Sequence, residues 1–105
     1  MTEKEKKEIK YIAYDWLNES EFPVNDNYEI EYSEKELNNF LVELKEDGYS
    51  EEEIKYFEKR VENFSEEREE ETYDSIPYED YNGGIDWYEE NYRTEVVVYT
   101  SKKIA

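Results

Sequence analysis

The acidic surplus is the feature that most constrains how this chain can fold. The 105 residues include thirty-one Asp and Glu against thirteen Lys and Arg, giving a formal net charge of -18. Residues 1–24 carry -2 and residues 102–105 carry +2, so the whole surplus lies in residues 25–101. Any compact state brings these like charges together. We therefore expect a folded domain of modest stability that added salt stabilises.

Aromatic residues indicate that the chain folds in spite of this charge. Acidic segments that are poor in aromatics stay disordered, because they cannot bury enough apolar surface. Here 17% of the residues are aromatic, and twelve of them are Tyr. The length fits one acidic domain, residues 1–105, with a small aromatic core.

The composition excludes several kinds of chemistry. The chain has no Cys and no His, which removes disulfides, thiol nucleophiles, Ser-His triads and Cys/His zinc sites. It also contains no glycine-rich phosphate loop. We expect no enzyme activity, no catalytic or cofactor-binding residue, no cofactor and no metal ligand. Oxygen-rich spacings occur in residues 25–36 and 80–86, but Ile30 stands where a calcium loop needs Gly, and calcium binding stays open.

The sequence also predicts where the protein acts. No apolar run approaches the roughly 18 residues that span a bilayer. The charged first ten residues lack the apolar stretch of a signal peptide. Direct binding to nucleic acid or to an anionic membrane is disfavoured by the charge. We expect a cytoplasmic protein with no membrane and no direct nucleic-acid contact.

Three helices are predicted in the first two thirds of the chain. An N-terminal helix is indicated by one apolar stripe: Ile9, Ile12, Ala13, Trp16 and Leu17. Capping boxes at residues 33–36 and 50–53 begin two further helices, and Gly48 ends the first of these. The short connection predicts a central antiparallel helical hairpin.

Two strands complete the expected α+β fold. Residues 28–32 alternate between polar and apolar, and residues 94–100 are rich in β-branched side chains. We expect these strands to pair in a small antiparallel sheet. Between the hairpin and the last strand we expect an exposed helix face or a linker at residues 67–71, a turn at residues 82–84 and a short helix at residues 85–92.

The segment of residues 65–95 is the candidate partner-binding region. It has twelve acids against two Arg, with Tyr and Trp interleaved. Tyr beside carboxylates suits an interface, since the ring gives rigid contact area and the carboxylate accepts Arg. The candidate residues are Glu66, Glu67, Glu69, Glu70, Glu71, Tyr73, Asp74, Tyr78, Glu79, Asp80, Tyr81, Asp86, Tyr88, Glu89 and Glu90.

In size, composition and this acid-and-Tyr segment, the chain resembles the nucleic-acid-mimicking inhibitors of phages and mobile elements, of the anti-CRISPR and anti-restriction type. The resemblance implies a non-enzymatic inhibitor that blocks the basic DNA- or RNA-binding surface of a host defence nuclease or CRISPR-Cas effector. The expected partner is therefore a basic nucleic-acid-binding protein, and the inhibitor is expected to be a monomer or a small homo-oligomer.

Two other interpretations stay open. Residues 32–64 followed by residues 75–78 resemble the acidic helical immunity proteins that neutralise nuclease toxins. The N-terminal helix and the strand at residues 96–98 depart from that all-helical pattern, and an antitoxin would be a variant of this alternative. The second alternative is an acidic adaptor domain that binds a basic protein.

Overall fold

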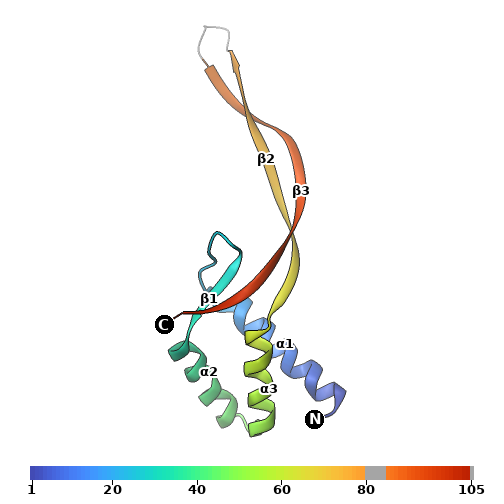
Figure 1. The fold of residues 1–105 in the computed structure, drawn as a ribbon, viewed down its shortest axis with the longest axis vertical. Helices are drawn as coiled ribbons and strands as arrows, with labels where there is room; N and C mark the ends of the chain where they lie inside the picture. The colour runs from blue at the N-terminus through green and yellow to red at the C-terminus, as the bar shows by residue number, and fades with distance from the viewer. Residues whose placement is uncertain (80–84, 105) are drawn as a thin grey trace. The chain divides into compact units, whose positions relative to one another are not determined.

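The computed structural model describes residues 1–79 and 85–104 of the chain, with side chains described at residues 1–71 and 94–104. The fold is α+β, as predicted (Figure 1). In chain order the elements are α1 (Glu3–Glu19), β1 (Glu29–Ser33), α2 (Glu34–Glu46), α3 (Glu51–Glu62), β2 (Ser65–Glu79) and β3 (Ile85–Ile104). The chain divides into two compact units: Met1–Glu66 together with the segment that starts at Val98, and Glu67–Val97.

Each helix begins at a capping box. The hydroxyls of Thr2, Ser33 and Ser50 accept a hydrogen bond from the amide three residues later, and the Glu there accepts one back. The boxes at Ser33 and Ser50 confirm the sequence prediction, whereas the box at Thr2 was not predicted. The hydroxyl and the amide of Thr2 hydrogen-bond the Glu5 carboxylate and lower its pKa.

The connection between α2 and α3 is a Schellman motif. The amide of Gly48 donates to the carbonyl of Lys45, and the amide of Tyr49 donates to the carbonyl of Leu44. Gly48 has φ +94°, a backbone conformation that residues with a side chain rarely adopt. The predicted helix end at Gly48 is therefore confirmed, together with the hairpin that it allows.

The helices and β1 enclose one hydrophobic core. Helices α1 and α3 pack together. The buried residues are Ile9, Ala13, Trp16 and Leu17 of the predicted N-terminal stripe, Leu37, Leu44, Phe57, Val61 and Phe64 from α2, α3 and the residues after α3, and Ile30 and Tyr32 from β1. Ile12, Phe40, Leu41 and Ile54 lie at the margin of this core, partly buried. Tyr14 and Tyr56 also flank the core, whereas Tyr11 is 71% exposed.

The sheet has the order β1-β3-β2. The predicted pairing of the first strand with the last is confirmed, but the partner residues are 100–104 and not 94–99: Glu29 lies opposite Thr100 and Ser33 opposite Ile104. Their direction is parallel and not antiparallel, since α2, α3 and β2 intervene and form the long crossover that a parallel pair requires. Strands β2 and β3 are joined by residues 80–84 alone, too short for a crossover, so this pair is antiparallel and the sheet is mixed.

The segment between α3 and the last strand is extended. Residues 67–71 belong to β2 and not to a helix face or linker, and residues 85–92 belong to β3 and not to a short helix. Aromatic side chains account for the strand at residues 85–92, since they favour strands. Residues 67–71 contain no aromatic side chain and extend by pairing with β3, which is distant in sequence and is not revealed by local periodicity. The predicted turn at residues 82–84 lies outside the described residues.

Burial predicts which core truncation costs most. Phe57 is fully buried, whereas Leu41 is only partly buried. Phe57→Ala should lower the free energy of unfolding by about 3–5 kcal/mol, and Leu41→Ala should lower it by less, because less of its side chain leaves water on folding. Urea denaturation followed by circular dichroism measures both, and equal losses would contradict this packing.

The burial of the Tyr32 phenol predicts that the protein loses stability at alkaline pH. Its side chain is 1% exposed, and burial, with a smaller effect of Glu62, raises the pKa of its phenol. A pKa that is higher in the folded state gives stability that is complete below about pH 10 and is lost as pH rises through the folded-state pKa. Urea denaturation at about pH 8 and about pH 11 should show this loss, and Tyr32→Phe should reduce it. A variant with the same alkaline slope as the parent would contradict the assignment.

Candidate functional site

The structure brings the predicted binding residues onto two paired strands. The candidate residues on β2 are Glu66, Glu67, Glu69, Glu70, Glu71, Tyr73, Asp74, Tyr78 and Glu79. Those on β3, which pairs with β2, are Asp86, Tyr88, Glu89 and Glu90. Asp80 and Tyr81 lie outside the described residues. Segments that are separate in the sequence thus form one antiparallel ribbon, whose paired backbones hold the acidic residues in an extended arrangement.

Strand geometry sorts the first acids of β2 onto two faces. Alternate side chains of a strand point to opposite sides, and exposure alternates from Ser65 to Glu71 accordingly. Glu66, Arg68 and Glu70 are half-buried, so the one base of this stretch lies between two acids on their face. The opposite face carries only exposed carboxylates: Glu67, Glu69 and Glu71. We call these three residues the acidic row.

The acidic row has a fixed spacing. Two residues of strand advance about 6.7 Å, so neighbouring carboxylates of the row project at about that interval. The next part of the site is a shallow hollow of about 440 Å³ lined by Glu69, Glu70, Glu71 and Thr94. Carboxylates and one hydroxyl offer hydrogen-bond acceptors and negative charge, which suits guanidinium and ammonium groups.

Metal binding has no support in the described residues. Among the residues whose side chains are described, 1–71 and 94–104, no group of three or more acids is placed to hold an ion. In the first oxygen-rich spacing, the Asn25 carboxamide oxygen accepts hydrogen bonds from the amides of Asn27 and Glu29. That oxygen therefore shapes a turn before β1. The second spacing, residues 80–86, lies largely outside the described residues.

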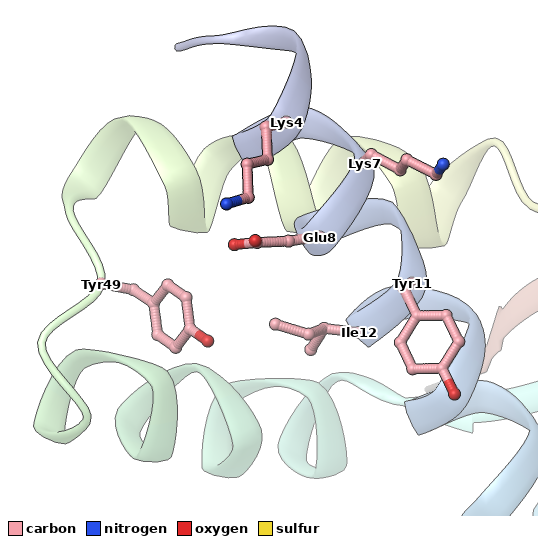
Figure 2. A pocket seen from close by; sticks show the side chains of 6 residues that line it. All are labelled: Lys4, Lys7, Glu8, Tyr11, Ile12 and Tyr49. Atoms are coloured by element: carbon pink, nitrogen blue, oxygen red, sulfur yellow. The ribbon is translucent and has the colours of Figure 1, made fainter.

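One surface hollow was not predicted from the sequence. This hollow of about 620 Å³ lies on the unit formed by Met1–Glu66 and the segment that starts at Val98, which we call the helical unit. It is lined by Lys4, Lys7, Glu8, Tyr11, Ile12 and Tyr49. Figure 2 shows Tyr49 reaching in from the connection of α2 and α3, with Ile12 and Glu8 extending from α1. The available signal was the spacing of Lys4, Lys7 and Tyr11, which repeats with the period of a helix beside the buried stripe.

Searches of protein-family models, of curated proteins and of solved structures gave no match to this chain. Its function is therefore argued from its own residues. Within the described part of the chain, no helix is both long enough and apolar enough to cross a membrane.

The acidic row predicts that salt stabilises β2. Raising NaCl from about 0.01 M to about 1 M shortens the Debye length from about 30 Å to about 3 Å, below the spacing within the row. Repulsion along the row then weakens, and hydrogen exchange at the amides of residues 67–71 should slow. Exchange in α3 serves as the internal reference, and equal slowing in both elements would contradict a local effect of the row.

Proposed function

We propose that this protein is a non-enzymatic acidic inhibitor that mimics nucleic acid and occupies the basic DNA- or RNA-binding surface of a host defence nuclease or CRISPR-Cas effector. The observation that supports the proposal is the acidic row, whose carboxylates are exposed on one face of β2 with no base among them. Solubility is a weaker explanation, because a net charge of magnitude about 2–8 suffices for it and this chain carries -18.

The charge density of DNA determines how much of the ribbon is needed to mimic it. One strand of DNA carries a phosphate every 3.4 Å or so along the axis, whereas the acidic row alone carries one carboxylate about every 6.7 Å. Carboxylates from both β2 and β3 must therefore contribute to match the spacing of phosphates. Residues 65–95 supply twelve acids against two Arg. The contact surface that we propose is the whole ribbon, with the acidic row at its best-described part.

The proposed mechanism is occupation of the target surface. A basic channel attracts the ribbon over long distances, so association is fast at low ionic strength and slows as salt rises. Arg and Lys of the channel then bind the carboxylates in place of phosphates. Two inhibitor copies repel each other, which favours a monomer bound to its target. The proposed setting is the cytoplasm of the host cell, where such nucleases and effectors meet nucleic acid.

Charge reversal on the acidic row tests the proposal. Glu67→Lys, Glu69→Lys and Glu71→Lys together should abolish capture and inhibition of the target, because the row would then repel a basic surface. The matched control changes Asp15, Glu43 and Glu46 to Lys, which alters the net charge equally at exposed positions on the helices. The helical content of both variants, measured by circular dichroism, should equal that of the parent.

The measurement is a pull-down from nuclease-treated host lysate, followed by activity assays of the recovered proteins. We expect to recover a nuclease or CRISPR effector that salt, DNA or heparin displaces from the protein. The parent and the control variant should both inhibit this target. Equal inhibition by the row variant would exclude the row as the contact surface. A small toxin that stays bound through a wash of about 0.5 M salt would overturn mimicry in favour of an immunity protein, since that contact would not depend on screened charge.

A further inference from the structure

The outer edge of β2 is an open strand edge. In the order β1-β3-β2, β2 pairs on one side with β3, and no other described strand lies beside it. The strand runs for 15 residues, against about 5–6 for an average strand. Its outer side therefore presents a row of backbone N–H and C=O groups, which is a template for another strand.

Where its side chains are described, at residues 67–71 and 94–97, the ribbon lacks the burial that usually stabilises a pair of strands. None of the described side chains within Glu67–Val97 is buried, and β1 pairs with β3 only from Thr100 onward. A two-stranded hairpin without a third strand or an apolar face is at best marginally stable in water. A strand added to β2 would supply backbone hydrogen bonds that this unit does not make internally.

The side chains along the edge select which strand can be added. A second copy of β2 would place Glu opposite Glu, and like charges opposite each other on paired strands are destabilising. A segment with Lys or Arg at every second position would instead place a cation beside each member of the acidic row, at a cross-strand separation of about 4.5–5.5 Å. The row therefore prevents self-pairing and favours an extended cationic segment.

Proline limits where the added strand can bind. Pro77 has no N–H to donate, and strand edges that contain Pro are poor templates beyond it. Residues 67–76 contain no Pro and include the acidic row, whereas the carbonyl of Ser65 already accepts a hydrogen bond from the Tyr14 hydroxyl. The stretch is long enough for a partner strand of ordinary length.

We propose that the outer edge of β2, along residues 67–76, binds an extended cationic segment of the target as an additional β-strand. This inference rests on the proposed function, because it specifies how the ribbon engages a basic partner. It differs from general electrostatic attraction in requiring backbone hydrogen bonds and an alternating pattern of cations. The opposing explanation is that the acids only protect an open edge against aggregation.

Three synthetic octapeptides, each with four Lys and four Thr side chains, separate these explanations. The first alternates Lys and Thr, the second has four Lys followed by four Thr, and the third is the alternating peptide N-methylated at its four central amides, which blocks both of its edges. Each is titrated into the full-length protein at about 0.05 M NaCl, where screening is modest. Binding is followed by fluorescence anisotropy and by the NMR shifts of backbone amides.

The alternating peptide should bind about tenfold or more tightly than either of the others. The methylated peptide loses backbone hydrogen bonds, and the second peptide places two Lys side chains on the face of the acidic row where the alternating peptide places all four. The shifted amides should be those of residues 67–76. Charge reversal of the acidic row should abolish binding, and the helical control variant should retain it. Equal binding of the three peptides, shifts confined to the helices, or no binding at all would overturn strand addition. The nucleic-acid-mimic proposal is judged separately, by loss of target inhibition in the row variant.

Discussion

The indole of Trp16 connects the elements of the helical unit, and their arrangement depends on its contacts. Its ring centroid lies 4.9 Å from that of Phe22, 5.6 Å from those of Tyr32 and Phe40, and 5.9 Å from that of Phe57. These partners come from the segment after α1, from β1, from α2 and from α3. In a chain with so much charge, a few large rings supply the burial that many aliphatic side chains supply elsewhere.

Acid is placed differently in the two units. In the helical unit, several acids sit in first helical turns, where they accept amide hydrogen bonds and favour the helix dipole. The acidic row has no such local use: Glu67, Glu69 and Glu71 cap no helix, and no base lies among them on their face of β2. This difference is the physical reason for proposing that the ribbon binds a partner, because the repulsion within the row costs stability and no structural role of the row offsets it.

Local rules recovered the helical unit from the sequence, since its signals lie within a few residues of one another. Ser33, Ser50 and Gly48 mark helix ends, and the apolar stripes locate the core. The ribbon was missed as a structure because Glu67 to Glu71 have little strand preference and extend only by pairing with β3. Its acids were nonetheless recognised as the candidate site, because charge can be counted without knowing the fold. The parallel direction of β1 depends on the whole intervening chain, which no short pattern encodes.

The ribbon is inserted within the sequence of the unit that holds the core. That unit runs from Met1 to Glu66 and resumes at Val98. Its two strand segments pair only once Glu29 lies opposite Thr100. During synthesis the three helices can therefore form from nearby residues, while the final strand of the core is made only after the ribbon. The entropy of closing a flexible loop grows only slowly, by about 0.6 kcal/mol for each doubling of length. The inserted segment can thus lengthen, shorten or change its charges over evolution while the core keeps its fold.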